Sequence, residues 1–476
     1  MIRLPDWASP VTDAFARAGV DLYIVGGGVR NPLLGLGTSE LDMCSGLMPD
    51  GLTELLRGVQ GVRATVISRK LGTVRIDVEG AAGRYIEHTV LRTENYGEGG
   101  HHRPEFVNTG VSIEEDANRR DFTVNAVYYD VARKKVLDPV GGLKDIENRR
   151  IRIVREDTLF DDALRILRMV RFACELGFTI EEATFKAAAR NVDMLRDIAP
   201  ERRAEELSKI LLSDAKYAPP EQADGAACLR GLELLRDLGA LEFLLPHLER
   251  GRGFSQPNEY HQYDVLYHNF YTCRHMPPAL HLRLAGLLHD VGKPEAYEQD
   301  GNFYEHARVG AALAAGMLGQ DGLRFKKALV ERVCLLIEEH MFDLDGSAKE
   351  TTVRLRFATL GLPVACELLW LRHADILGSR EGNSAEFFIR KWGSVLLALQ
   401  RDGTPPSPDA LEIGGEDIMR VCGLGPGERV GLIKERLWRH CVYDPRQNTR
   451  ERLLRRAVSL NRELPPGMTK KAKKKR

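Results

Sequence analysis

The sequence predicts an α+β protein in which a small N-terminal sheet domain is followed by a mostly helical chain. Residues 23–25 (Tyr-Ile-Val) form a short β-prone run that leads directly into the glycines 26–28. Val74, Ile76 and Val78 alternate with charged residues at strand spacing. Residues 160–172 instead carry apolar side chains at helical spacing. At 476 residues the chain is long enough for several domains.

The composition limits the classes of partner and location. Lys plus Arg and Asp plus Glu both number 68, so attraction to RNA has to come from local basic patches. No apolar run is long enough to span a bilayer, and the N-terminus lacks a signal-peptide pattern. The eight cysteines include no C-x-x-C pair, which favours a reducing cytoplasm over a zinc finger or a disulfide framework. The lysine-rich segment 463–476 is predicted to be a disordered basic tail.

The first elements lead to a turn suited to binding an anion. Residues 1–20 predict an amphipathic helix before the strand at 23–25, and the glycines 26–28 allow backbone N–H groups to close around an anion. Arg30 adds a fixed positive charge. Glu40 and Asp42 are two apart, so on an extended chain both carboxylates point to one face. Such a pair is suited to holding divalent ions for phosphoryl or nucleotidyl transfer.

Further elements follow before residue 100. A helix is predicted over residues 52–59 and a strand over 74–78, after which residues 80–83 (Gly-Ala-Ala-Gly) turn the chain back. The return segment 84–94 carries Glu87. Its carboxylate is a candidate third acidic group beside the first two, and a solvated charge on a strand is the alternative.

These residues carry a family resemblance. Gly-Gly-Gly-Val-Arg-Asn-Pro-Leu-Leu-Gly at 26–35, followed by Glu-Leu-Asp at 40–42, resembles the first motif of the class II tRNA nucleotidyltransferase and bacterial poly(A) polymerase family. That motif reads Gly-Gly-x-Val-Arg-Asp-x-Leu-Leu-Gly and then Asp-x-Asp, so Asn31 and Glu40 depart from it. The resemblance implies a polymerase β-like nucleotidyltransferase head. In it, Mg²⁺ is held by Glu40 and Asp42, Glu87 is a further catalytic carboxylate, and the triphosphate is held by Gly26, Gly27, Arg30 and Arg120.

A second motif matches the family without a change. It is Arg119-Arg120-Asp121-Phe-Thr-Val-Asn125-Ala. The forked donors of the two arginines suit triphosphate oxygens. Asp121 and Asn125 are four apart, so on a helix they share a face and could hydrogen-bond ribose hydroxyls. The run 138–145 resembles the family's Asp-Pro-x-Gly-Gly-x-x-Asp turn.

The predicted helix over 160–172 holds a candidate base-reading pair. Asp162 and Arg165 are three apart and project together on a helix. A carboxylate accepts and a guanidinium donates hydrogen bonds, so the pair can read base edges. It resembles the family's Glu-Asp-x-x-Arg motif, which is credited with choosing CTP or ATP. The resemblance adds Arg168 to the nucleotide-binding set, and residues 201–207 resemble the family's Glu-Arg-x-x-x-Glu-Leu helix.

From about residue 255 the pattern changes. A histidine, a His-Asp pair and a later aspartate follow the ligand order of the HD superfamily of metal-dependent phosphohydrolases. Imidazole and carboxylate together suit Mn²⁺, Ni²⁺, Fe or Zn²⁺. The candidate ligands are His268, His289, Asp290 and Asp375, with His306 and His340 as further candidates.

The domain organisation that follows has five parts. They are a nucleotidyltransferase head (1–150), a helical neck that recognises the nucleotide and tRNA (151–250), an HD domain (251–400), a tRNA-binding helical tail (401–462) and the basic segment 463–476.

The predicted function is a cytoplasmic CCA-adding tRNA nucleotidyltransferase, monomeric or homodimeric, that uses CTP, ATP and Mg²⁺. CC addition, A addition and full CCA addition all fit the motifs. One alternative is a poly(A) polymerase. That branch shows a Gly-Arg-Arg-Phe-like run where this chain has Ser-Arg-Lys-Leu at 68–71, which speaks against the alternative. A second alternative is an HD phosphohydrolase whose head only binds RNA. A plain RNA-binding module would not need the clustered carboxylates.

Overall fold

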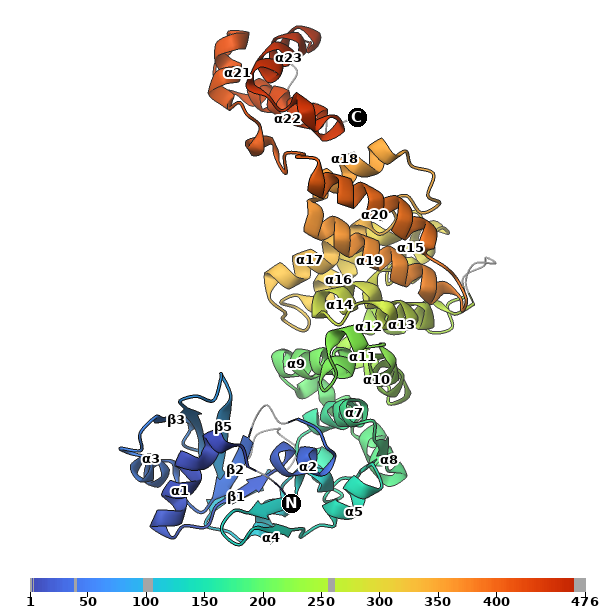
Figure 1. The fold of residues 1–476 in the computed structure, drawn as a ribbon. Coiled ribbons are helices and arrows are strands. Elements are labelled where there is room, and N and C mark those ends of the chain that lie inside the picture. The colour runs from blue at the N-terminus through green and yellow to red at the C-terminus, as the bar shows by residue number, and fades with distance from the viewer. Residues whose placement is uncertain (1, 3, 38–40, 97–105, 256–261, 466–476) are drawn as a thin grey trace. The chain divides into compact units, whose positions relative to one another are not determined.

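The computed structural model describes residues 2, 4–37, 41–96, 106–255 and 262–465 (Figure 1). The chain forms two compact units. The first unit comprises residues 1–250, 278–280 and 316–327, and the second comprises 251–277, 281–315 and 328–476. The predicted five-part division is finer than this and stays a prediction.

A mixed sheet organises the start of the first unit. Its strand order is β3-β4-β5-β2-β1-β8-β9. β2 and β5 run parallel, whereas the other neighbours are antiparallel. The strands are β1 (Tyr23–Val25), β2 (Leu41–Ser45), β3 (Val62–Ser68), β4 (Thr73–Val78), β5 (Tyr85–Val90), β8 (Tyr128–Asp130) and β9 (Lys135–Leu137). Two small pairs are separate: β6 (Arg92–Asn95) with β7 (Phe106–Thr109), and β10 (Arg150–Ile151) with β11 (Thr179–Ile180).

Helices accompany the sheet in the first part of the chain, and the later part of the described chain is helical. Figure 1 shows the strands gathered near the N-terminus and, from α8 onward, helices alone within the described residues. The first-unit helices are α1 (Ser9–Ala18), α2 (Gly27–Leu33), α3 (Pro49–Leu55), α4 (Ile113–Asn118), α5 (Gly142–Glu147), α6 (Thr158–Asp161), α7 (Leu164–Leu176), α8 (Glu182–Arg190), α9 (Pro200–Leu211), α10 (Ala226–Asp237), α11 (Leu241–Leu244) and α12 (Pro246–Glu249).

The later helices carry the rest of the chain. They are α13 (Val265–His275), α14 (Leu280–Leu288), α15 (Lys293–Asp300), α16 (His306–Leu318), α17 (Lys327–Glu339), α18 (Glu350–Leu360), α19 (Leu362–Ser379), α20 (Glu386–Arg401), α21 (Gly415–Cys422), α22 (Glu428–Tyr443) and α23 (Arg450–Glu463). Buried Trp392 packs edge-on against Phe357 and Phe388 within this set. No helix of the described chain is long and apolar enough to cross a membrane.

The α+β class and the strand at 74–78 are confirmed, and several local predictions need correction. The helix expected over 1–20 is a 3-10 turn (Asp6–Ala8) followed by α1. The helix expected over 52–59 is α3, which begins at Pro49, where the fixed φ of proline favours a first helical position.

Two further corrections bear on the site. Asp121 and Asn125 do not share an α-helix, because Phe122 is extended and Thr123–Asn125 form a 3-10 turn. The continuous helix predicted over 160–172 is also wrong. Asp162 has φ −146° and ψ 103°, so its extended backbone separates α6 from α7.

Candidate active site and metal centre

The acidic centre of the head is built on two neighbouring strands. Asp42 on β2 pairs in register with Glu87 on β5, so the two carboxylates lie side by side on the sheet. Gly26 adjoins them, with φ +63°, and a Cβ there would lie 3.1 Å from Oδ2 of Asp42. The site therefore needs glycine at this turn both for its conformation and for space. Glu40 lies outside the described residues.

Arg30 on α2 is buried and held by the protein. Its Nε and Nη2 donate to Oδ1 of Asn31 at 3.1 and 2.9 Å, its Nη1 donates to Oδ1 of Asn125, and its guanidinium lies 5.0 Å from the ring centre of Phe172. Asn31 in turn donates through Nδ2 to the carbonyl of Gly37 and to the hydroxyl of Tyr217. An aspartate could not make these donations, which gives the departure at residue 31 a structural role.

Asp121 is the next member of the same network. Its Oδ1 accepts from Nδ2 of Asn125 at 3.0 Å, and its Oδ2 accepts from Nε and Nη2 of Arg168 at 2.9 and 2.6 Å. Burial raises the pKa of Asp121, but Arg168 and Asn125 outweigh it and keep the pKa well below its usual range. Four predicted nucleotide-binding residues (Arg30, Asn125, Asp121 and Arg168) thus form one hydrogen-bonded chain.

Arg119 and Arg120 are both anchored on Asp116, which sequence reasoning missed. Arg119 donates to its Oδ1 at 2.9 Å, and Arg120 donates to its Oδ2 at 3.1 Å. The Tyr128 hydroxyl also donates to Oδ2, at 2.6 Å. Burial raises the pKa of Asp116, but the two arginines and Tyr128 lower it to about 2. The signal that could have found Asp116 is its spacing of three and four residues from the two arginines.

The predicted reading pair is not joined in the structure. Oδ1 of Asp162 accepts from the backbone N–H of Leu164, and its Oδ2 accepts from Nη2 of Arg202 at 3.0 Å. Arg165 is buried and donates to the carbonyl oxygens of Thr158 and Arg119 at 3.0 and 2.9 Å. The break at Asp162 is the cause, because its extended backbone turns the carboxylate toward the N–H of Leu164, the first residue of α7, so Asp162 and Arg165 do not lie on one helix.

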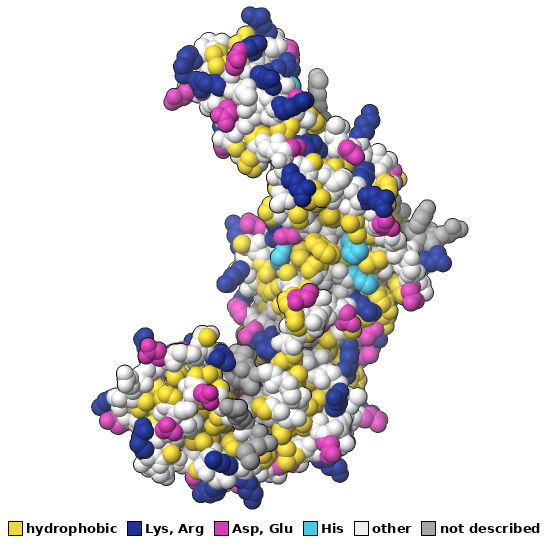
Figure 2. All heavy atoms as spheres, viewed as in Figure 1, with side chains coloured by type: hydrophobic (Ala, Val, Ile, Leu, Met, Phe, Trp, Pro, Cys, Tyr) yellow, Lys and Arg dark blue, Asp and Glu magenta, His cyan; other side chains and the backbone are white. Residues whose placement is uncertain are grey.

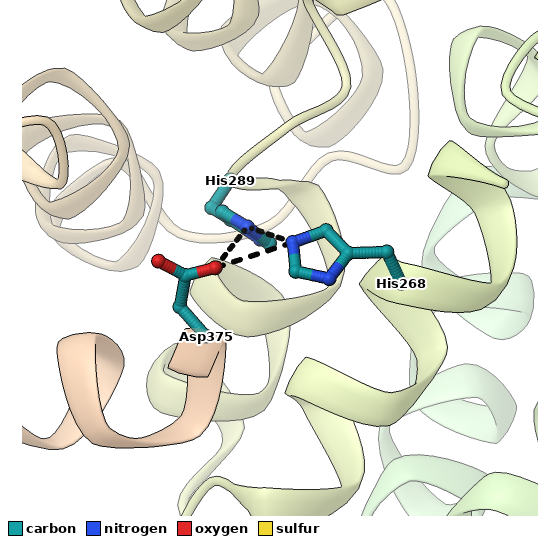
Figure 3. A group of neighbouring side chains, drawn as sticks. All are labelled: His268, His289 and Asp375. Carbon is teal, nitrogen blue, oxygen red and sulfur yellow. Dashed lines mark hydrogen bonds and ion pairs between the residues drawn. The ribbon is translucent and has the colours of Figure 1, made fainter. Parts of the chain in front are cut away.

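The second unit holds a cluster of buried metal-type ligands. Figure 3 shows His268, His289 and Asp375 pointing toward one another from different parts of the chain. Nε2 of His268 lies 3.0 Å from Nε2 of His289 and 3.2 Å from Oδ1 of Asp375. Imidazole nitrogens converging with a carboxylate form the donor set of a transition-metal site.

Asp290 connects this cluster with a second one. Its Oδ2 lies 3.3 Å from Nε2 of His268 and 3.4 Å from Nε2 of His289. Its Oδ1 lies 3.1 Å from Nε2 of His306 and 3.5 Å from Nε2 of His340. All four predicted ligands are therefore brought together with the two further candidates. The two sets could hold two ions that share the Asp290 carboxylate.

The surroundings of the cluster orient the ligands toward a metal. Nδ1 of His289, His306 and His340 lie 2.9, 2.5 and 2.6 Å from the carbonyl oxygens three residues before each of them. With a metal bound, Nδ1 of each would donate to that carbonyl and Nε2 would offer its lone pair to the ion. Burial raises the pKa of Asp290, but Lys293 and His289 hold it well below its usual range. The carboxylate is ionised, as a metal ligand must be.

A cavity of about 1060 Å³ opens beside the cluster. Its lining includes Asp290, His306, His340 and Asp375, together with the basic residues Lys293, Arg372 and Arg380. Cations beside a metal cluster suit a substrate that carries phosphate.

Comparison with known proteins identifies the family. The poly A polymerase head domain matches residues 22–152, the HD domain matches 260–377, and a probable RNA and SrmB-binding site of polymerase A matches 177–218. The A-adding tRNA nucleotidyltransferase of Deinococcus radiodurans is 34% identical over 346 residues, which cover 69% of this chain and 75% of that protein. The chain belongs to the tRNA nucleotidyltransferase and bacterial poly(A) polymerase family. It is an enzyme of the nucleotidyltransferase class.

Other members of the family extend the likeness to nearly the whole chain. The CC-adding tRNA nucleotidyltransferase of Thermus thermophilus is 32% identical over 431 residues, covering 86% of this chain and 87% of that one. The crystal structure of the Bacillus stearothermophilus CCA-adding enzyme in complex with CTP shares the fold, with a TM-score of 0.70 and 23% identity over 97% of this chain and 99% of that chain.

Proposed function

We propose that this enzyme completes tRNA 3′ ends by adding C, C and A from CTP and ATP. The observation that carries the proposal is the register pairing of Asp42 with Glu87 beside the Gly26 turn, within a family of tRNA nucleotidyltransferases. Relatives that match over most of both chains are named as A-adding and CC-adding enzymes, which favours tRNA over poly(A) synthesis.

The residues of the head have distinct proposed roles. Asp42 and Glu40 would hold Mg²⁺, which supplies charge neutralisation and activates a hydroxyl nucleophile when it is bound. Glu87 adds a third carboxylate beside Asp42. Backbone groups at Gly26 and Gly27, with Arg119 and Arg120, would face the triphosphate. The network around Arg30, Asp121, Asn125 and Arg168 would fix the position of these groups.

Nucleotide choice is proposed to depend on Asp162 and an arginine. Cytosine and adenine each present an amino donor beside a ring-nitrogen acceptor, whereas uracil and guanine present the reverse. A carboxylate beside a guanidinium matches the first arrangement and opposes the second. By the family motif the arginine is Arg165.

The tail helices are the proposed surface for the body of the tRNA. α23 presents exposed arginines, including Arg452, Arg455 and Arg462. Figure 2 shows Lys and Arg side chains over this part of the second unit, interspersed with acidic ones. Because the net charge of the chain is zero, such a local patch would supply the attraction to phosphates. A cytoplasmic location and a monomeric or homodimeric state stay predictions.

The test uses three tRNA transcripts, ending at the discriminator base, after C and after CC. Each is incubated with Mg²⁺ and with CTP, ATP or both, and the 3′ ends are sequenced. The proposal expects completed CCA ends on all three. Long A tails would support poly(A) polymerase, and no addition with Mg²⁺ or Mn²⁺ would leave the head as an RNA-binding domain.

A second proposed activity is metal-dependent phosphoester hydrolysis in the HD domain. The supporting observation is the Asp290 carboxylate placed between two histidine pairs beside a cavity with basic lining. Mn²⁺, Ni²⁺ or another transition metal suits these ligands. The test follows hydrolysis of 2′,3′-cyclic nucleotides and of p-nitrophenyl phosphate with each metal. Absence of hydrolysis with Mg²⁺, Mn²⁺, Ni²⁺ and Co²⁺ would reduce the domain to a scaffold.

A further inference from the structure

The open face of the head sheet carries a cation beside the acidic pair. Alternate residues of β4 and β5 are buried, and the residues between them lie on the other, solvent-facing side of the sheet. Arg75 on β4 pairs in register with Glu87 on β5, and Glu87 in turn pairs with Asp42 on β2. Because directly paired residues share a face of a sheet, Arg75 is next in line after the two carboxylates.

The guanidinium of Arg75 is held in place by its neighbours on the same face. Its Nε and Nη2 donate to Oδ1 of Asp77 at 2.9 and 2.8 Å, and its Cζ lies 4.2 Å from the ring centre of Tyr85. The side chains of Arg75 and Asp77 are each 44% exposed. Among the described residues these are the side-chain partners of Arg75, so the end of the fork formed by Nη1 and Nη2 is open to an acceptor with two oxygens.

The strand order separates Arg75 from the turn proposed to face the triphosphate. In the order β4-β5-β2-β1, the carboxylates lie on the two middle strands. Gly26 follows β1 on one side of them, where a Cβ would lie 3.1 Å from Oδ2 of Asp42. The strand of Arg75 lies on the other side, two strand spacings or roughly 10 Å from β2.

This separation indicates where the RNA strand approaches. An in-line transfer places the attacking hydroxyl and the leaving pyrophosphate on opposite sides of the reacting phosphorus. A triphosphate on the Gly26 side therefore puts the hydroxyl, with the strand that carries it, on the Arg75 side. The carboxylates of Asp42 and Glu87 repel RNA phosphates, and Arg75 offsets this repulsion along that approach.

We infer that Arg75 binds a backbone phosphate of the RNA strand that is extended, at one of the last three linkages before the 3′ hydroxyl. The inference rests on the proposed function, because it assigns the RNA end to one side of the catalytic carboxylates. The two non-bridging oxygens of a phosphodiester match the open end of the guanidinium fork. A phosphate contact carries no sequence information, so Arg75 positions the strand without reading its bases.

The experiment measures KM for tRNA ending at the discriminator base, KM for CTP, and the salt dependence of tRNA binding in filter assays. Arg75→Ala should raise KM for tRNA about 3- to 10-fold and leave KM for CTP unchanged, as expected for one lost charge-assisted hydrogen bond at an exposed site. The slope of log Kd against log[KCl] should fall by about 0.7, the value for one phosphate contact to a single strand. Arg75→Lys keeps the charge without the fork and should lie between.

Arg57→Ala is the matched control. It removes an arginine of the same unit whose side chain is 76% exposed and pairs with Glu54, and it should keep the wild-type values. If Arg75→Ala behaves as this control does, the inference is wrong. A raised KM for CTP with an unchanged KM for tRNA would assign Arg75 to the triphosphate and would also overturn it.

A second set of tRNAs identifies the phosphate. In each of them, one of the last three linkages is a neutral methylphosphonate. At one linkage the wild-type enzyme should lose affinity by the factor that Arg75→Ala loses on unmodified tRNA, and Arg75→Ala should lose scarcely more there. Additive losses at all three linkages would contradict the contact. Failure of the proposed function is distinct, because the wild-type enzyme itself would then add no nucleotide to tRNA.

Discussion

Asp116→Asn tests whether one buried carboxylate holds the arginine pair of the head in place. In the wild type this carboxylate accepts hydrogen bonds from Arg119, Arg120 and the Tyr128 hydroxyl, and its side chain is fully buried. Asparagine keeps the shape but loses the charge and replaces one acceptor oxygen with a donor. The two arginines would then lie beside a neutral group in a buried place.

The magnitude follows from the pKa of this group. An aspartate whose pKa falls from its ordinary value of 3.8 to about 2 on folding stabilises the folded head by about 2.5 kcal/mol. Because the pKa is lowered, this contribution is present in full at neutral pH and is lost as the pH falls from about 4 toward 2. Asp116→Asn should therefore cost about 2.5 kcal/mol at pH 7 and about half as much at pH 3.

The assay is urea unfolding followed by pulse proteolysis, with thermolysin at pH 7 and pepsin at pH 3. Mass spectrometry of peptides from residues 106–130 reports on the head, and peptides from α20 give an internal reference in the other unit. Glu114→Gln, an exposed change on the same helix, is the control. An equal loss of stability at both pH values, or a loss no larger than that of the control, would refute the reasoning.

Three further predictions concern the sites directly. Asp42→Asn should abolish nucleotide addition while filter-binding assays still show tRNA binding. Glu40→Asp should leave the rate of addition equal or faster. If the wild-type enzyme were inactive and Glu40→Asp restored addition, the head would be a nucleotidyltransferase domain that has lost its activity. Gly26→Ala should lower kcat at least about tenfold, because its Cβ would press on Asp42 from a strained backbone, and an unchanged kcat would contradict this account. Asp290→Ala should lose both metal ions per chain and His340→Ala should lose one, as measured by elemental analysis, with at least about a 100-fold loss of affinity for each lost ion. Equal metal stoichiometry in the two variants would contradict a carboxylate shared by two ions.

The sequence predicted the strand-borne carboxylates but not how they meet. Asp42 and Glu87 are separated along the chain by β3 and β4, and their pairing depends on β5 returning beside β2 in parallel. The register between β2 and β5, which are separated by two other strands along the chain, is set by tertiary packing. The motif that contains Asp42 therefore indicated Glu87 as its partner only through the family resemblance.

The reading pair shows where periodicity failed. Apolar spacing over 160–172 is continuous, so it predicted one helix and placed Asp162 above Arg165. In the structure α6 ends at Asp161, and Oδ1 of Asp162 accepts from the backbone N–H of Leu164, the first residue of α7. Aspartate ahead of an apolar helical run is a typical start signal and could have indicated the break. Arg202 lies forty residues after Asp162 in the sequence, so no local pattern could have predicted their contact.

The metal ligands were predictable as types but not as an arrangement. The order of His268, His289, Asp290 and Asp375 indicated one site. His306 and His340 carried no spacing that tied them to it, because α16 and α17 bring them in from separate segments. Only the folded chain shows the two oxygens of Asp290 facing different histidine pairs.

The division of the chain into its two units has a consequence for how such a protein can be inherited or cut. Residues 316–327, from the end of α16 into the segment before α17, belong with the first unit, and Arg324 there pairs with Glu201 on α9. If the chain were divided after residue 250, residues 316–327 of the first unit would therefore be left on the C-terminal fragment. Exchange of the HD segment between relatives would keep this contact only if residues 316–327 and α9 were inherited from the same parent.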